Sequence, residues 1–101
     1  MYTVYVLPRA LQEIKNLPGH LRQRVKRMID ELANNPRPAG SIELSGIVLP
    51  KPNVRLHRFK LEKWRIIYAI DEGEIVVDVM AVRQRPPYDY GDLNELIKAI
   101  L

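Results

Sequence analysis

The sequence has 101 residues, of which 47% are hydrophobic and 28% charged, and this size and balance predict a single globular domain over 1–101. It contains no cysteine, which excludes disulfides, thiolate metal ligands and a cysteine nucleophile. No apolar run reaches the ~20 residues needed to span a bilayer, and the N-terminus lacks the basic start of a signal peptide, so we expect a cytoplasmic protein. The formal net charge is +4 and the bases cluster, which indicates an anionic or acidic partner.

The first third of the chain predicts a strand and two helices. The β-branched and aromatic residues 2–7 predict a strand that Pro8 ends, and a short helix follows to about Asn16. Apolar residues at helical spacing then predict a second helix, and this stripe consists of Leu21, Val25, Met28, Ile29 and Leu32. Because the residue before a proline avoids the helical conformation, this helix stops before Pro36, and the two helices form a hairpin.

The rest of the chain predicts a loop, three strands and a last helix. Residues 35–54 contain four prolines and two glycines, which predicts a long loop with a short extended piece at 47–49. Tight turns are expected at 62–63 and 71–73. They join three strands, over 55–61, 64–71 and 74–83. A short amphipathic helix, with Asp92 near its N-cap, ends the chain.

This β-α-α-β-β-β-α order predicts an α+β fold in which a helical hairpin packs on a small antiparallel sheet. Consecutive strands with tight turns form an antiparallel meander, to which the N-terminal strand is added. The hairpin covers one face of the sheet. A normally twisted sheet makes the other face concave, and basic residues could line it.

Basic residues concentrate in the predicted strands. Six Lys or Arg and one acid lie between Lys51 and Arg65. Because side chains alternate along a strand, Arg58 and Lys60 present two cations at one surface. Such a surface suits a polyanion, and the tyrosines that follow the last strand add stacking faces and a hydroxyl that can carry a proton. RNA is the ligand that uses all of these features together.

Metal-independent cleavage of RNA needs a group that takes the proton of the attacking 2′-OH, a group that protonates the leaving oxygen, and cations that stabilise the transition state. Arginine suits the last task, and a lysine or tyrosine among crowded cations suits the proton transfers. No metal or cofactor is needed, because the attacking and leaving groups belong to the substrate. The candidate catalytic residues are Arg58, Lys60, Arg65, Arg85 and Tyr88. The candidate RNA-binding residues are Lys63, Arg83 and Tyr90.

The same residues also have structural interpretations. The basic face could be solvated with no ligand, since charge runs are usually exposed. Tyr88 and Tyr90 could pack as a lid over the sheet edge. Trp64 is expected to be packed, and His57, whose place in the alternation is opposite to that of the basic pair, is expected to be packed or peripheral rather than catalytic. The acids within 71–78 fit solubility better than a metal site.

Five short motifs follow one another along nearly the whole chain. They are Leu11-x-x-Ile14-x-x-Leu17-Pro18, LANNPRP at 32–38, LSG at 44–46, RFKLEKWRIIY at 58–68 and AVRQR at 81–85. In this order and spacing they resemble the toxins of the RelE/ParE superfamily, from bacterial and archaeal type II toxin–antitoxin systems, and the RelE-like branch in particular. The resemblance implies the RelE-like microbial ribonuclease fold.

The resemblance also implies an activity. RelE-like members are ribosome-dependent mRNA endoribonucleases, or mRNA interferases, which cut mRNA in the ribosomal A site, leave a 2′,3′-cyclic phosphate and so inhibit translation. Carried over by position, Arg58 and Lys60 contact the mRNA and help in proton transfer, and Arg65 and Arg85 stabilise the phosphate. One of the two tyrosines beyond Arg85 stacks on a base or serves in acid–base chemistry.

An antitoxin partner follows from the same resemblance, in a hetero-oligomer that binds operator DNA through the antitoxin. Its apolar, acidic segment is expected to cover or displace the 92–101 helix by coupled folding and binding. Two alternatives stay open. One is a ParE-like poison of DNA gyrase, whose members lack the ribonuclease residues, and the other is a catalytically inactive homologue that binds antitoxin. The basic residues retained here argue against the gyrase poison.

Overall fold

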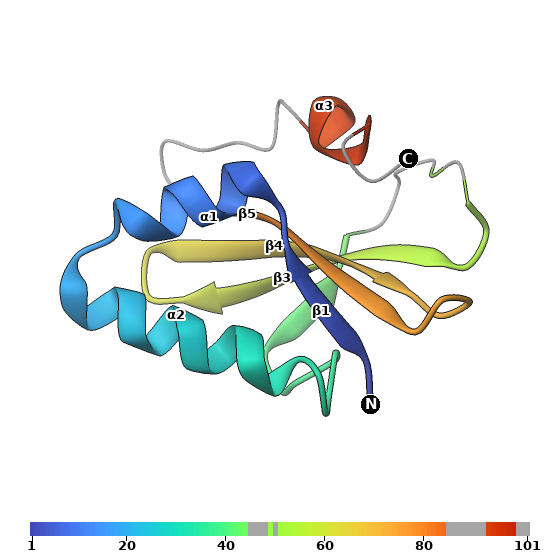
Figure 1. Cartoon of the computed structure of the whole chain (residues 1–101), viewed down its shortest axis with the longest axis horizontal. Coiled ribbons are helices and arrows are strands. Elements are labelled where there is room, and N and C mark those ends of the chain that lie inside the picture. The colour runs from blue at the N-terminus through green and yellow to red at the C-terminus, as the bar shows by residue number, and fades with distance from the viewer. Residues whose placement is uncertain (45–48, 50, 85–92, 99–101) are drawn as a thin grey trace.

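The computed structural model describes residues 1–44, 49, 51–84 and 93–98, and it shows a five-stranded sheet with helices on both faces (Figure 1). The helices are α1 Pro8–Lys15, α2 Gly19–Glu31 and α3 Leu93–Lys98. The strands are β1 Thr3–Val6, β2 Ser41–Glu43, β3 Val54–Leu61, β4 Trp64–Asp71 and β5 Val76–Gln84. The predicted α+β class, with a helical hairpin on a sheet, is confirmed.

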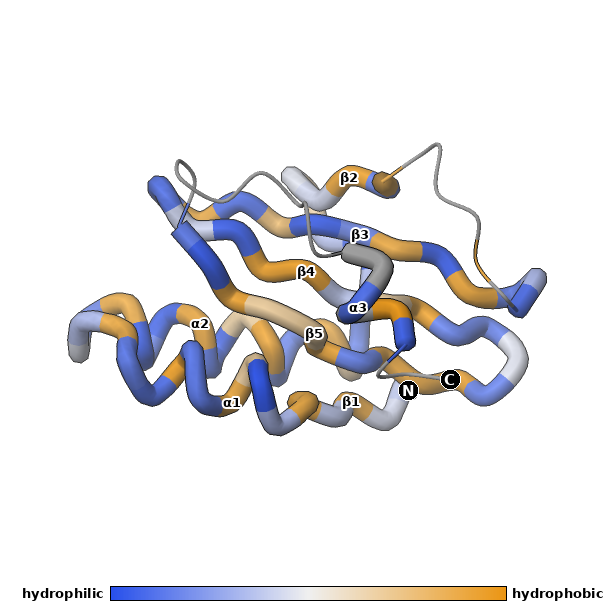
Figure 2. Tube along the Cα trace, turned by 90° about the horizontal axis from the view of Figure 1, so that it is seen from above, coloured by the Kyte–Doolittle hydropathy of each residue, from blue (hydrophilic) through white to orange (hydrophobic). Residues whose placement is uncertain are grey.

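The strand order is β1-β5-β4-β3-β2, and Figure 2 shows the strands side by side in this order. The meander of β3, β4 and β5 is antiparallel, as predicted, but β1 runs parallel to β5, so the sheet is mixed rather than antiparallel. The structure also adds a strand within the predicted loop, because Ser41–Glu43 pairs with β3. Three residues are too few to show a period of two, so the sequence did not indicate β2.

The turn between β4 and β5 differs from the predicted one. Asp71 pairs with Val76, so the loop holds four residues and β5 begins later than expected. Its left-handed residue is Ile75, with a φ of 57°, and not Gly73. The apolar run of β4 did predict that strand over 64–71. The predicted extended piece at 47–49 lies mostly outside the described residues.

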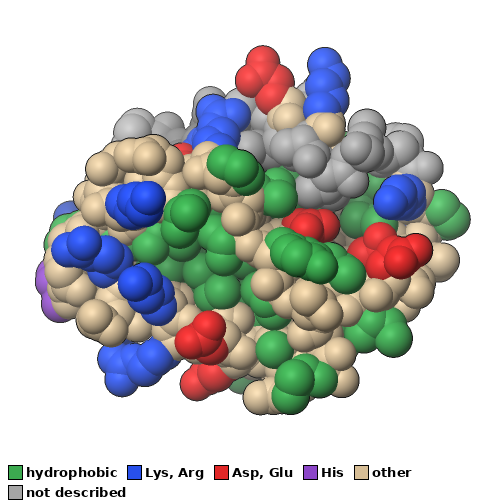
Figure 3. Space-filling model, in the orientation of Figure 1, with side chains coloured by type: hydrophobic (Ala, Val, Ile, Leu, Met, Phe, Trp, Pro, Cys, Tyr) green, Lys and Arg blue, Asp and Glu red, His purple; other side chains and the backbone are tan. Residues whose placement is uncertain are grey.

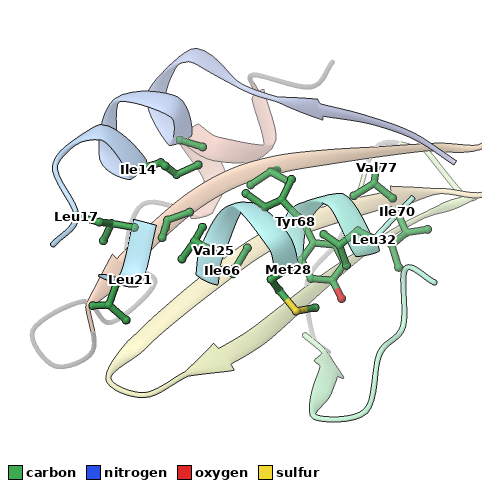
Figure 4. Close-up of a cluster of buried hydrophobic side chains, with 14 residues drawn as sticks. Ile14, Leu17, Leu21, Val25, Met28, Leu32, Ile66, Tyr68, Ile70 and Val77 are labelled. Atoms are coloured by element: carbon green, nitrogen blue, oxygen red, sulfur yellow. The ribbon is translucent and has the colours of Figure 1, made fainter. Parts of the chain in front are cut away.

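One apolar core lies between the sheet and the helical hairpin (Figure 4). Figure 4 shows the helix stripe predicted from the sequence pointing toward β4 and β5. Tyr68 is fully buried at this interface, and its hydroxyl donates a hydrogen bond to the Pro36 carbonyl over 2.8 Å. That bond ties the segment after α2 to the central strand.

A second apolar cluster lies on the opposite face of the sheet, where α3 covers it. Its buried members are Val54, Leu56, Ile67, Ala69, Met80, Ala81 and Ile97. The central strands are therefore buried on both faces, which accounts for the continuous apolar run of β4. In the part of the chain that the structure describes, no helix is long and apolar enough to cross a membrane.

Candidate nucleic-acid interface

Three cations stand side by side across β3, β4 and β5. Lys60 pairs with Arg65, and Arg65 pairs with Arg83, so the register places all three on one face of the sheet. Directly opposed residues of neighbouring strands have Cβ atoms about 4.5–5.5 Å apart. We call Lys60, Arg65 and Arg83 the cationic row. It lies on the same face as Leu56, Ile67 and Ala81, beyond the apolar cluster and next to the β3–β4 turn.

Arg58 extends this basic surface along β3. It lies two residues before Lys60 and therefore on the same face, opposite Ile67 of β4 and Ile42 of β2. Lys60 is exposed, whereas Arg58 is half-buried. The expectation that the two side chains share one side is confirmed by the register.

Arg65 is held against the β3–β4 turn. Its Nη1 donates to the Glu62 carbonyl over 3.1 Å and to the Trp64 carbonyl over 3.0 Å. Its Nε is buried and has no hydrogen-bond partner among the described residues. The guanidinium is thus fixed in place by backbone groups, and no carboxylate of the described residues forms an ion pair with it.

The β3–β4 turn is itself fixed to the helical hairpin. Leu61 pairs with Trp64, which leaves Glu62 and Lys63 as the two turn residues. Glu62 has a φ of 56° and forms an ion pair with Arg24 of α2. Lys63 is exposed at the tip, beside the cationic row, where its contact with RNA stays a prediction.

Arg83 has an internal carboxylate partner that sequence reasoning missed. Its Nε donates to Oε2 of Glu13 over 2.5 Å, and the second carboxylate oxygen, Oε1, accepts the Val82 backbone N–H over 3.1 Å. The two side chains are largely buried, with 14% of Arg83 and 24% of Glu13 exposed. The guanidinium of Arg83, which is predicted to contact RNA, is therefore already paired with a carboxylate of the protein.

Three predicted site residues lie outside the described residues. They are Arg85, Tyr88 and Tyr90. The last residue of β5, Gln84, pairs with Trp64 at the end of the sheet that carries the cationic row. Arg85 follows Gln84 directly in the sequence. The choice between the two tyrosines stays open.

His57 faces the helical side, opposite to Lys60. Its side chain is buried, it stacks on Tyr68 with ring centroids 5.8 Å apart, and neither ring nitrogen has a hydrogen-bond partner among the described residues. Burial lowers the pKa of His57, and the nearby Arg37 lowers it further. The prediction of a packed histidine is confirmed, and so is that of a packed Trp64, which lies against the helix-side core.

Charge is polarised along the sheet. The basic residues lie toward the β3–β4 turn, whereas Asp71 and Asp78 lie on the same face toward the β4–β5 turn. Burial, and then the neighbouring Asp71, raise the pKa of Asp78. Figure 3 shows the same trend, with Lys and Arg gathered over α1 and α2 near the β3–β4 turn. No group of three His, Asp or Glu side chains with metal-binding geometry occurs within the described ranges.

The fold is similar to that of RelE toxins in solved structures. The RelE–RelB complex from Pyrococcus horikoshii OT3 matches with a TM-score of 0.73 and 21% identity, over 86% of this chain and 98% of that chain. The isolated E. coli RelE toxin matches with a TM-score of 0.66 and 25% identity, over 100% of both chains. The intact E. coli RelBE toxin–antitoxin complex matches with a TM-score of 0.64 and 26% identity, over 83% of this chain and 96% of that chain.

The sequence itself matches one family profile. Residues 4–86 match the ParE toxin of the type II toxin–antitoxin system parDE. Since the match spans most of the chain, the protein belongs to this family, within the RelE/ParE superfamily, and is a toxin of a type II toxin–antitoxin system. No curated protein sequence matches it.

Proposed function

We propose that the protein is an mRNA interferase, a ribosome-dependent endoribonuclease of the RelE type that arrests translation in the cytoplasm. The observation that carries the proposal is the cationic row beside the end of β5. Lys60 and Arg65 stand directly opposite each other on one face, and neither forms an ion pair among the described residues, so their repulsion favours an anionic ligand. A phosphodiester bent between Arg58, Arg65 and the segment after β5 meets that need.

The residues divide the chemistry among them. The 2′-OH attacks the adjacent phosphorus, the 2′-O–P bond forms, and the P–O5′ bond breaks, leaving a 2′,3′-cyclic phosphate and a 5′-OH. Lys60 and Arg58 contact the RNA and assist the proton transfers, while Arg65 and Arg85 stabilise the extra negative charge. Tyr88 stacks on a base or protonates the leaving oxygen, and Lys63 and Tyr90 bind the RNA around it. The mechanism assigns no step to a metal.

The partner that restrains this activity is an antitoxin. Solved relatives include the intact E. coli toxin–antitoxin complex, and we propose a comparable hetero-oligomer here, which binds operator DNA through the antitoxin. The six residues of α3 are too few for a stable isolated helix, so α3 depends on the apolar cluster beneath it, to which Ile97 belongs. An apolar antitoxin segment can take the place of α3 on that cluster.

The second candidate function is a poison of DNA gyrase, which the match to the ParE profile favours. The cationic row favours the ribonuclease over the gyrase poison, because ParE-like gyrase poisons lack the basic residues of the ribonuclease site. A catalytically inactive homologue that binds antitoxin is the third candidate. Such a homologue would have the same fold but would not cleave mRNA.

Induction of the chain in growing cells tests these candidates together. The mRNA ends are mapped, the SOS response is measured, and Arg85→Ala is induced in parallel with Lys15→Ala, an exposed residue of α1, as the matched control. We expect breaks within translated codons for the wild type and the control, and none for R85A, which still binds antitoxin. DNA double-strand breaks with an SOS response and intact mRNA would establish the gyrase poison instead. Efficient cutting of naked RNA by the purified chain would contradict the dependence on the ribosome.

A further inference from the structure

The outer edge of β5 lies beside β1 along the first half of the strand and beside α1 along the second half. β1 pairs only with Val76–Val79, and the last hydrogen bond of this pairing joins the Leu7 N–H to the Val79 carbonyl over 3.0 Å. The chain then turns at Pro8 into α1. From Met80 onward, β5 therefore has α1, and not a strand, along its outer edge.

Glu13 of α1 replaces the missing strand at this edge. One carboxylate oxygen accepts the Val82 N–H, which would otherwise be an unpaired donor on a buried strand, and the other oxygen accepts the Nε–H of Arg83. Both oxygens are thereby used on two consecutive residues of one strand. This is a bidentate clamp, and its two bonds fix the position and the direction of the end of β5.

The clamp also acts on the cationic row. Arg83 is the outer member of the row, and Glu13 is its carboxylate partner, so the guanidinium is drawn toward the outer edge of the sheet, away from Lys60 on β3. The negative charge of Glu13 offsets the repulsion between Arg83 and Arg65. Without Glu13, the side chain of Arg83 would lose this ion pair at the outer edge of the sheet.

We propose that Glu13 is a positioning residue of the ribonuclease site, acting through Arg83 and the end of β5; this rests on the proposed function. Val82 and Arg83 are the clamped residues, and Arg83 stands directly across from Arg65, so a shift of the clamped segment changes how these two arginines lie relative to each other. A displacement of about 1 Å in a site that works by orientation lowers the rate by about 100-fold. Both carboxylate oxygens of Glu13 are used within the protein, so Glu13 acts on the RNA through Arg83 and not by direct contact.

Three variants separate positioning from a merely structural role. Glu13→Gln keeps one acceptor oxygen but cannot accept from both donors, so it breaks the clamp with little loss of volume. Arg83→Gln removes the group through which Glu13 is proposed to act. Glu31→Gln, at an exposed site on α2, makes the same change of charge elsewhere and serves as the control.

The assay is single-turnover cutting of mRNA on programmed ribosomes, with the unfolding free energy measured on the same samples. We expect E13Q to lower the maximal rate by about 10- to 100-fold with the half-saturating toxin concentration changed less than about twofold. In the R83Q background, the same substitution should change the rate by less than about twofold, because the two residues act as one unit. E31Q should cut like the wild type.

The possible results lead to different conclusions. If E13Q cuts like the wild type, or if its effect adds in full to that of R83Q, Glu13 is only a strand cap and the inference is wrong, while the proposed function stands. If the wild type does not cut mRNA on ribosomes, the proposed function is wrong and the inference falls with it. Should E13Q be too unstable to assay, Arg83→Lys keeps the charge without the Nε–H donor, and undiminished cutting by R83K would overturn the inference equally.

Discussion

Lys60→Gln is expected to make the protein more stable and less active at once. Lys60 is exposed and sits at the inner end of the cationic row, directly across from Arg65. The substitution removes one of the two like-charge neighbours of Arg65 and keeps a side chain of similar length. The hydrogen bonds of Arg65 to the turn carbonyls do not involve Lys60, so they persist in the variant.

The size of the gain follows from the register. Like charges directly opposed on neighbouring strands destabilise a sheet by about 0.2–1 kcal/mol per pair. Removing the pair should therefore raise the unfolding free energy by about that amount, which for a domain of this size raises Tm by about 1–6 °C. The lost cation should lower the rate of mRNA cutting, because Lys60 faces the proposed RNA site.

Salt provides the check on the cause. At about 0.05 M salt, charges on neighbouring strands interact strongly, whereas at about 1 M the screening length is only about 3 Å. The gain of K60Q measured by urea unfolding should therefore be largest at low salt and nearly vanish at high salt. Lys15→Gln, which replaces an exposed lysine in the last turn of α1 and outside the sheet, is the control and should show no such gain. A gain that is absent, or the same at both salt concentrations, would refute the repulsion across the row.

Two further predictions concern stability. Ile75→Gly should raise the unfolding free energy by up to about 1 kcal/mol, because a φ of 57° strains a β-branched residue by more than the backbone entropy of glycine costs, and its side chain is 51% exposed; Ile75→Val keeps the strain and should show no gain. Burial lowers the pKa of His57, so the folded state binds its proton less readily than the unfolded chain, and this stability is present above the ordinary pKa of 6.5 and lost as the pH falls through it. His57→Phe should therefore lose less unfolding free energy than the wild type between about pH 7.5 and pH 5.5, and an equal loss in both proteins would contradict the assignment.

The sequence predicted the elements whose pattern is local. The helix stripe on α2 and the continuous apolar run of β4 each extend over several periods, and both elements occur where the pattern indicated them. The turn at 71–73 was placed too early, because Asp71-Glu72-Gly73 matches a tight hairpin signal, whereas the pairing of Asp71 with Val76 leaves four residues in the loop and a left-handed Ile75. The parallel direction of β1 could not be predicted from the sequence either, because it depends on which strand β1 pairs with in the folded sheet.

The candidate site likewise has parts that local sequence patterns predicted and a part that they did not. Alternation along one strand was enough to place Arg58 and Lys60 together and His57 on the other face. The contact between Glu13 and Arg83 joins residues 70 positions apart, and it exists because α1 lies along the part of β5 that β1 leaves unpaired. No spacing rule within either element signals such a pair.

The placement of charge on α2 does not stabilise that helix. A helix is stabilised by acids near its N-terminus and by bases near its C-terminus. α2 has no acid in its first turn and no base in its last turn, while Arg22 lies near its start and Asp30 near its end. α2 and the cationic row, on opposite faces of the sheet, therefore both hold cations where the folded chain gains little stability from them, so neither placement is explained by folding alone.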